Sequence, residues 1–322
     1  MVIEEIKIYL KKGIYLGLDD RLFFRLTLKN VLNNIRLFIS SLLKGSLQMI
    51  RQKDNTNSII KGNKIIRRKL DGQLIIIEHN KWVYRKYTDL KQFEQIKEGH
   101  STLETLFNIN KVELIDTCFT KEKFVSGKIL TYSSHSVQNQ VFNEIINVYC
   151  KNVISNDIKG YPAGVNAEQF FLKLENTLYP DELKKFVFDN KEKVITLLEA
   201  FKWTWAHGDL TPDNILYGDN GYTVMDGERC EILPVFYDIA NLMNTYLLMA
   251  NNENCYINYF RGKYDSLLKS IIGIDEVNNY RKVVLIVMMV LKGTIAWDAE
   301  IKRDNAELMT KRWKSISKFL ID

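Results

Sequence analysis

The sequence has few cysteines and prolines, and its apolar runs are short. Its 322 residues include 4 cysteines, 4 prolines and 16 glycines, which excludes collagen-like and linker-dominated chains. No two cysteines form a CxxC pair, so we expect reduced cytosolic thiols rather than a zinc site or a disulfide framework. The longest apolar run, Val283 to Leu291, is far shorter than the roughly 20 residues of a membrane-spanning helix. It predicts a buried helix.

The composition is that of a globular protein. With 46% hydrophobic and 26% charged residues the chain can fill a core, and its length predicts two domains or one large two-lobed unit. Glu4 and Glu5 stand where a secretory signal would be basic, and no apolar stretch follows them. We therefore expect no signal peptide.

Acidic residues are absent from residues 21–53, which carry seven basic ones. Apolar residues recur there at spacings of three and four, which predicts one helical face: Phe24, Leu28, Val31, Ile35, Phe38 and Leu42. The basic side chains that fall elsewhere on this helix are Arg25, Lys29, Arg36 and Lys44. Such a helix either packs on the rest of the protein with its basic side in solvent, or lies on an anionic membrane interface.

From Ser58 the pattern changes to short β-type runs. Residues 58–130 predict three strands, a helix over 90–107 and two further strands over 112–119 and 122–130, with Asp71-Gly72 as a hairpin turn. Helical patterns then dominate, and a strand–turn–strand segment, NILYGDNGYTVMD, interrupts them. The predicted helices cover 137–155, 167–176, 181–189, 191–206, 236–250, 256–272 and 276–320. The sequence thus predicts an α+β fold with a helical extension (1–57), a small antiparallel β-rich lobe (58–130) and a larger, mainly helical lobe (131–322).

One stretch has a recognisable motif. Residues 207–216 read HGDLTPDNIL, residues 224–228 read VMDGE, and residues 234–242 read PVFYDIANL. The first resembles the catalytic loop of the kinase-like phosphotransferases, the superfamily of aminoglycoside phosphotransferases and choline kinases, and the second resembles their metal-binding element. The resemblance is strong only over residues 207–242. It implies a protein-kinase-like two-lobed fold, with nucleotide bound by the small lobe and the acceptor by the helical lobe.

The chemistry of phosphoryl transfer fits these residues. The reaction needs a carboxylate near the acceptor hydroxyl and oxygen ligands for Mg²⁺. Asp209 would be the catalytic carboxylate, and Asn214 and Asp226 the metal ligands. His207 is expected to hold the loop backbone, and Asp238 to bond to it. An Asp-Leu-Thr-Pro-Asp-Asn run can also be a plain turn and helix cap.

A cation that holds phosphate is expected in the third strand of the small lobe. Arg85 and Lys86 both lie there, and strand alternation sends them to opposite faces. The resemblance favours Lys86, because the family uses a lysine. It implies Glu98 in the following helix as the partner of Lys86, with Glu94 as the second choice.

Other nucleotide contacts are implied more loosely. Residues 69–73 are the candidate phosphate loop, although they lack GxGxxG. Phe124 and Val125 resemble the hinge that offers backbone groups to adenine. Three tryptophans are expected in the core rather than at a ligand: Trp203, Trp205 and Trp297.

The sequence therefore predicts an ATP- and Mg²⁺-dependent phosphotransferase acting on a hydroxyl of a small molecule or glycan. The net charge of +6 favours a neutral or anionic acceptor over a polycationic aminoglycoside. The motifs also look like those of superfamily members that accompany bacterial surface-polysaccharide synthesis. That likeness implies a cytoplasmic protein, peripheral at the inner membrane face through residues 21–53, with a lipid-linked acceptor.

Three other classes of protein fit the sequence less well. A protein kinase needs an activation segment, and Gly227 and Pro234 are too close in the chain to hold one. A non-catalytic kinase-like scaffold would lack one of the three acting residues, Asp209, Asn214 or Asp226. A nucleic-acid binder needs basic surface interleaved with exposed aromatics, so no nucleic-acid partner is expected.

Overall fold

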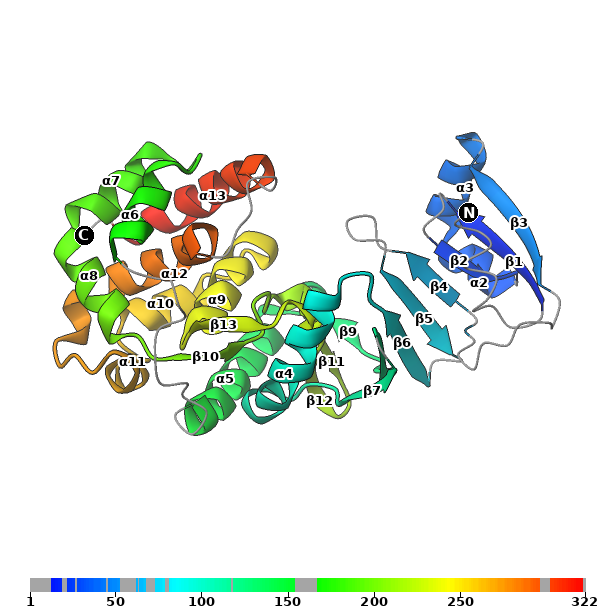
Figure 1. Cartoon of the computed structure of the whole chain (residues 1–322), viewed down its shortest axis with the longest axis horizontal. Coiled ribbons are helices and arrows are strands. Elements are labelled where there is room, and N and C mark those ends of the chain that lie inside the picture. Colours follow the sequence, from blue (N-terminus) through cyan, green and yellow to red (C-terminus); the bar gives the residue numbers. More distant parts are fainter. Residues whose placement is uncertain are drawn as a thin grey trace. The chain divides into compact units, whose positions relative to one another are not determined.

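The chain folds into two compact units (Figure 1). The computed structural model describes residues 13–18, 22–26, 28–44, 46–52, 62, 64–67, 73–78, 81–116, 118–153, 167–295 and 302–320. Unit 1 comprises Met1–Lys97 and Asn110–Ser126, and unit 2 comprises Glu98–Ile109 and Gly127–Asp322. Helix α4 (Leu90–Leu106) contributes its first half to unit 1 and its second half to unit 2.

Unit 1 is built on an eight-stranded sheet in which each neighbouring pair is antiparallel. The strand order is β3-β1-β2-β4-β5-β6-β8-β7. The strands are β1 (Gly13–Leu18), β2 (Leu22–Arg25), β3 (Leu47–Gln52), β4 (Lys64–Arg67), β5 (Leu74–Glu78), β6 (Trp82–Lys86), β7 (Val112–Asp116) and β8 (Phe119–Lys123). The predicted order of three strands, a helix and two strands is therefore confirmed for β4 to β8.

Apolar side chains lie on both faces of this sheet. Successive residues of a strand point to opposite sides, and neighbouring residues of β1 and of β2 are both apolar. One face buries a cluster that includes Tyr15, Phe23 and Ile76. The other buries Leu16, Leu18, Leu22 and Phe24. Two short helices, α2 (Leu28–Asn33) and α3 (Ile35–Leu43), cover part of this second face.

The single helix predicted over residues 21–53 is wrong at both ends. Phe24 lies in β2, and residues from Leu47 on form β3. Only residues 28–43 are helical, in two pieces. Local spacing misled the prediction because β-strands with two buried faces also place apolar residues three or four apart. Residues 13–52 thus add strands to the same sheet as the residues after 64.

Unit 2 is mainly helical. Its described helices after α4 are α5 (His135–Asn152), α6 (Ala167–Glu175), α7 (Asp181–Asp189), α8 (Lys191–Ala200), α9 (Tyr237–Ala250), α10 (Asn254–Phe260), α11 (Asp265–Ile272), α12 (Arg281–Ile295) and α13 (Lys302–Ser317). Helix α12 packs against α6, α8 and α9. The run from Val283 to Leu291 is buried in it, as predicted.

Two small sheets interrupt these helices. β10 (Trp203–Ala206) pairs with β13 (Glu231–Pro234), and β11 (Ile215–Gly218) lies between β12 (Gly221–Val224) and β9 (Lys128–Ile129). The hairpin β11–β12 is the predicted strand–turn–strand segment. The prediction of a helix over 191–206 is wrong after Ala200, because β10 pairs with a strand far along the chain.

Other predicted boundaries also change. The strand predicted over 122–130 is divided, since β8 ends at Lys123 and β9 pairs with β11. The helix predicted over 256–272 breaks near Gly262, whose φ of 82° is outside the helical range. The predicted 276–320 helix is divided into α12 and α13.

All four cysteines lie among the described residues, and each is a free thiol. Within the described parts of the chain, no helix is both long and apolar enough to cross a bilayer.

Candidate active site

The HGDLTPDN loop leaves the end of β10. Pairing of β10 with β13 sets Ala206 opposite Glu231, so the loop that follows β10 and the turn that precedes β13 emerge at the same end of a two-stranded ladder. That turn, at Gly227–Arg229, comes directly after Asp226. The ladder thereby brings two motifs together that are separated in the sequence.

Asp238 anchors the start of the loop. Its carboxylate is fully buried and accepts hydrogen bonds from the backbone N–H groups of His207 (2.7 Å) and Gly208 (3.0 Å). Asp238 lies in the first turn of α9, after Phe236 with its φ of 87°. Bonds from N–H groups to a buried carboxylate are among the stronger ones in proteins. The predicted backbone-holding role of Asp238 is confirmed.

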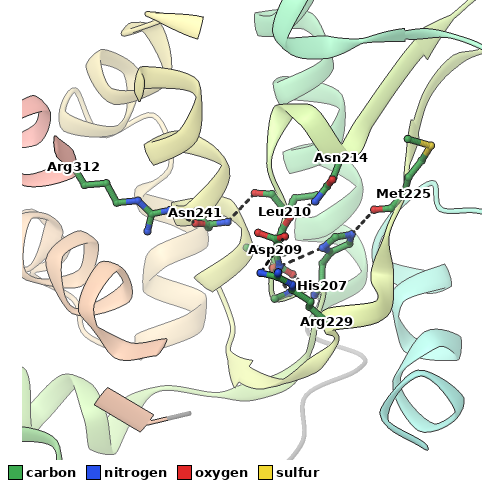
Figure 2. Close-up of polar contacts among 10 residues, drawn as sticks. His207, Asp209, Leu210, Asn214, Met225, Arg229, Asn241 and Arg312 are labelled. Carbon is green, nitrogen blue, oxygen red and sulfur yellow. Dashed lines mark hydrogen bonds and ion pairs between the residues drawn. The ribbon is translucent and has the colours of Figure 1, made fainter. Parts of the chain in front are cut away.

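His207 also serves the backbone. Its ring Nε2 lies 2.8 Å from the carbonyl oxygen of Met225, which can only accept, so Nε2 carries the proton (Figure 2). Nδ1 then accepts, at 3.4 Å, from the backbone N–H of Asp209. The side chain is buried. These contacts agree with the prediction that His207 holds the loop.

Asn214 closes the loop on itself. It ends a 3₁₀ turn, Pro212–Asn214, and its Nδ2 donates to the backbone carbonyl of Asp209 at 2.8 Å. The backbone carbonyl of Asn214 accepts a hydrogen bond from the backbone N–H of Met225, also at 2.8 Å. Since Nδ2 is used within the loop, Oδ1 of the same amide is the atom that Asn214 has for a cation. Asp209, Asn214 and the residue before Asp226 are thus joined by two hydrogen bonds.

Asp226 has a left-handed backbone, with φ 59° and ψ 44°. Aspartate tolerates this conformation better than most residues, yet it still costs about 1–3 kcal/mol and is concentrated at functional sites. The next residue, Gly227, is tightly enclosed: a Cβ there would lie 3.2 Å from Leu103 and 3.2 Å from Ile109. The second half of α4 and the segment after it therefore fix the position of the Asp226 turn.

Three further residues belong to the loop's surroundings, and sequence reasoning missed them. Arg229 Nη1 lies 3.6 Å from Asp209 Oδ2, and both side chains are partly exposed. Asn241 Nδ2 donates to the carbonyl of Leu210 at 3.0 Å, and Arg312 Nη2 donates to Asn241 Oδ1 at 3.2 Å (Figure 2). Asn241 stands in the PVFYDIANL segment and could have been suspected. No local signal points to Arg312.

The candidate phosphate-side residues of unit 1 lie on one strand. Arg85 and Lys86 end β6 and face opposite sides of the sheet. Arg85 Nε forms an ion pair with Glu122 Oε1 at 2.8 Å, and both side chains are nearly buried. Lys86 is half-buried and lies opposite Leu74 and Phe119 in the ladders.

The predicted carboxylate partners lie on α4. Glu98 is exposed and belongs to unit 2. Glu94 is exposed, belongs to unit 1 and pairs with Lys97 at 3.3 Å. The pairing of Lys86 with either one stays a prediction.

Of the remaining candidate residues from the sequence, some lie among the described residues and some do not. Phe124 and Val125 follow β8 directly, and the Phe124 N–H donates to the Lys81 carbonyl at 2.8 Å. Residues 69–72 of the candidate phosphate loop lie outside the described residues, as does Trp297. Trp203 is buried, as expected, and Trp205 is half-buried.

A known family matches part of unit 2. Residues 166–268, which contain Asp209, Asn214, Asp226 and Asp238, match the profile of a family described as "Phosphotransferase enzyme family". No curated protein matches the chain.

Solved structures resemble the chain in fold at low sequence identity. An apo thermostable mutant of aminoglycoside phosphotransferase APH(4)-Ia has a TM-score of 0.51 at 12% identity, covering 79% of this chain and 92% of that one. A choline kinase from Cryptosporidium parvum Iowa II has a TM-score of 0.48 at 16% identity, covering 80% and 89%. The amicoumacin kinase hAmiN, in complex with AMP-PNP and Ca²⁺, has a TM-score of 0.46 at 13% identity, covering 79% and 87%.

The fold class predicted from the sequence is confirmed: an antiparallel-sheet unit and a mainly helical unit, as in the aminoglycoside phosphotransferase structure. The family match, located on the segment that carries the motif, and the fold together support a relationship of this chain to the kinase-like phosphotransferase superfamily.

Proposed function

We propose that this protein is an enzyme that transfers the γ-phosphate of ATP, with Mg²⁺, to a hydroxyl group of a small molecule or glycan. One observation carries the proposal. Asp209, Asn214 and the Asp226 turn, which the reaction needs together, are tied into one network by the bonds from Asn214 to Asp209 and from Met225 to Asn214.

Asp209 is the proposed catalytic residue. Its side chain is about one-third exposed, so an acceptor hydroxyl can reach it. In a loose phosphoryl-transfer transition state the carboxylate mainly orients the hydroxyl and accepts its proton. His207, Asp238 and Asn214 hold the loop backbone, so Asp209 can act without moving it.

Asn214 and Asp226 are the proposed metal ligands, and their chemistry fits Mg²⁺. Both offer oxygen, which hard cations prefer, and Mg²⁺ commonly uses one or two protein ligands and completes its shell with phosphates and water. Among the described residues, no group of three or more His, Cys, Asp or Glu side chains could hold a metal. When bound, the metal would neutralise charge on the phosphates.

Unit 1 is proposed to bind the nucleotide. Lys86 would contact the phosphates with Glu98 as its partner, and the backbone at Phe124 and Val125 would contact adenine. We retain Lys86 over Arg85 because the family resemblance implies a lysine, and Arg85 forms an ion pair with Glu122 on the neighbouring strand.

The acceptor proposed is a neutral or anionic sugar, free or lipid-linked, of the kind used in bacterial surface-polysaccharide synthesis. The net charge of +6 and the basic segment 21–53 favour it over a polycation.

A thermal-shift titration tests the nucleotide site without knowledge of the acceptor. ATP at about 100 times its dissociation constant should stabilise the folded protein by about 2.7 kcal/mol, a rise of several degrees in melting temperature. We expect the shift to require Mg²⁺ and to be lost in Asp226→Ala. Asp219→Ala is the matched control, because Asp219 is an exposed aspartate in the turn of the adjacent hairpin.

Two results would contradict the assignment. The absence of any shift at millimolar ATP and Mg²⁺ would favour the non-catalytic scaffold. An equal shift in Asp226→Ala and Asp219→Ala would remove Asp226 from the metal site.

A further inference from the structure

The helices α2 and α3 and the residues next to them expose an unusual number of large apolar side chains. Of 17 exposed large hydrophobic side chains in the described residues, eight lie between residues 26 and 49. They are Leu26, Leu32, Ile35, Leu37, Ile39, Leu42, Leu43 and Met49. Single exposed apolar residues are ordinary, but a concentration of them marks an interaction surface.

Four of these side chains form a stripe along α3. At 100° per residue, Ile35, Ile39, Leu42 and Leu43 fall within an arc of about 100°. Their exposed fractions range from 42% for Ile35 to 82% for Leu43. We call these four residues the outer stripe.

The outer stripe extends outward from the side of the helices that holds them to the sheet. Val31 and Phe38 pack against the cluster of Leu16, Leu18, Leu22 and Phe24, and Ser41 is fully buried. Around α3, Leu42 lies about 40° and Leu43 about 140° from Phe38. A surface helix of a globular protein ordinarily confines its apolar residues to the side that faces the core, whereas those of α3 continue into solvent. The face predicted from sequence grouped the packed Val31 and Phe38 with the exposed Ile35 and Leu42.

The charge around the stripe favours one kind of partner. Residues 21–53 contain seven basic residues and no acidic one. Arg36 and Lys44 are exposed. Arg36 lies about 20° from Leu43 around the helix, and Lys44, the C-cap of α3, lies about 100° from Leu43. Two copies of such a surface would repel each other, whereas an anionic lipid surface offers both apolar chains and negative charge.

We propose that α3 docks on an anionic lipid surface, with the outer stripe inserted at the level of the headgroups, Arg36 beside lipid phosphates, and Lys44 reaching the surface from the C-terminal end of the helix. The docking requires neither nucleotide nor acceptor, so it stands or falls independently of the proposed phosphotransferase activity.

Vesicle sedimentation of the full-length chain tests this. Wild type is mixed with phosphatidylcholine vesicles that contain either about one-third phosphatidylglycerol or none, at low and high salt. We expect binding to the anionic vesicles, weakened by salt. Ile39→Gln/Leu43→Gln should weaken it roughly tenfold or more, because it removes half of the apolar stripe. Arg36→Gln/Lys44→Gln should weaken it roughly 25-fold, about fivefold for each cation.

Matched controls distinguish binding through the outer stripe from non-specific hydrophobic binding and from an effect of net charge. Leu172→Gln/Leu178→Gln removes two similarly exposed leucines from unit 2. Lys185→Gln/Lys311→Gln removes two exposed lysines there. Both should bind vesicles like wild type. Melting temperatures, and the ATP shift in each variant, check that folding and the nucleotide site are unaffected.

Several outcomes would overturn the proposal. One is no binding to anionic vesicles, and another is binding that the stripe variant leaves unchanged. A third is concentration-dependent dimerisation, abolished by Ile39→Gln/Leu43→Gln, which would assign the stripe to a second copy of the chain. A fourth is retention on DNA without vesicle binding, which would assign the basic segment to a nucleic acid.

Discussion

The loop that carries Asp209 and the strand that carries Lys86 are positioned by different kinds of contact. Side chains bond to the backbone of the Asp209 loop at several points: Asn214 from within the loop, and Asp238 from a segment about 30 residues further along the chain. Lys86 is placed by strand pairing to Leu74 and Phe119. A loop fixed by specific polar groups has a strict sequence motif, whereas a ladder accepts many sequences. The Asp209 loop is therefore recognisable in the sequence, whereas the choice between Arg85 and Lys86 stays open.

The largest expected effect is on turnover in Asp209→Asn. Loss of a positioned catalytic carboxylate typically costs a factor of about 10²–10⁴. Turnover is measured as ATP consumed with acceptor present. Nucleotide binding should be retained, because Asn214 and Asp226 are unchanged. Loss of ATP binding in this variant would move Asp209 from the acceptor side of the site to the nucleotide side.

Asp238→Ala should give the next largest effect, on stability. It leaves the buried N–H groups of His207 and Gly208 without their acceptor, and each such group costs about 1–3 kcal/mol. Chemical denaturation should show a loss of this size, with reduced turnover in the protein that still folds. Asp219→Ala is the control, expected within about 0.5 kcal/mol of wild type. Unchanged stability would mean that Asp238 does not anchor the loop.

A pair of neighbouring substitutions resolves the ambiguity in β6. Arg85→Met leaves the nearly buried Glu122 carboxylate without its partner. It should lower the free energy of unfolding by about 3 kcal/mol, the lower end of the range for a buried ion pair that loses one partner. Lys86→Met should weaken Mg²⁺·ATP binding roughly tenfold, equivalent to about 1.4 kcal/mol. The opposite pattern, with ATP binding lost only in Arg85→Met, would make Arg85 the phosphate-holding residue.

Arg229→Gln should have the smallest effect. Its ion pair with Asp209 joins two partly exposed side chains at 3.6 Å, and such pairs are worth about 0–1 kcal/mol. We expect a change in melting temperature near the limit of detection and a change in turnover below tenfold. A loss of turnover as large as that of Asp209→Asn would make Arg229 part of the chemistry rather than a neighbour of it.

Features that depend on residues close together in the sequence could be predicted, and features that depend on residues far apart in the chain could not. Asp209 and Asn214 stand five residues apart, and their spacing alone suggests a shared loop. The hairpin that leads to Asp226 was also visible locally. The pairing of β10 with β13 was not, because Trp203 and Pro234 are far apart in the chain. Arg312 reaches the loop only through Asn241, from a helix near the C-terminus.

In the N-terminal region, the prediction from local periodicity was wrong in part. Spacings of three and four predicted residues 28–43 well enough, but Phe24 lies in a strand, and Val31 packs on the sheet whereas Ile35 is exposed. A sheet with two buried faces, and a helix whose apolar residues continue from the packed side into solvent, both break the rule that one periodic stripe marks one buried face. The correct division needed the register of β1 with β2 and β3.

The fate of the γ-phosphate tests the central claim most directly. Wild type is incubated with Mg²⁺ and γ-labelled ATP and with a panel of free sugars, sugar phosphates and lipid-linked glycans, and the products are separated. The account predicts label in one of these acceptors as a phosphate monoester that a phosphatase removes. Label found only on protein side chains, or only as inorganic phosphate while ATP is bound, would contradict it.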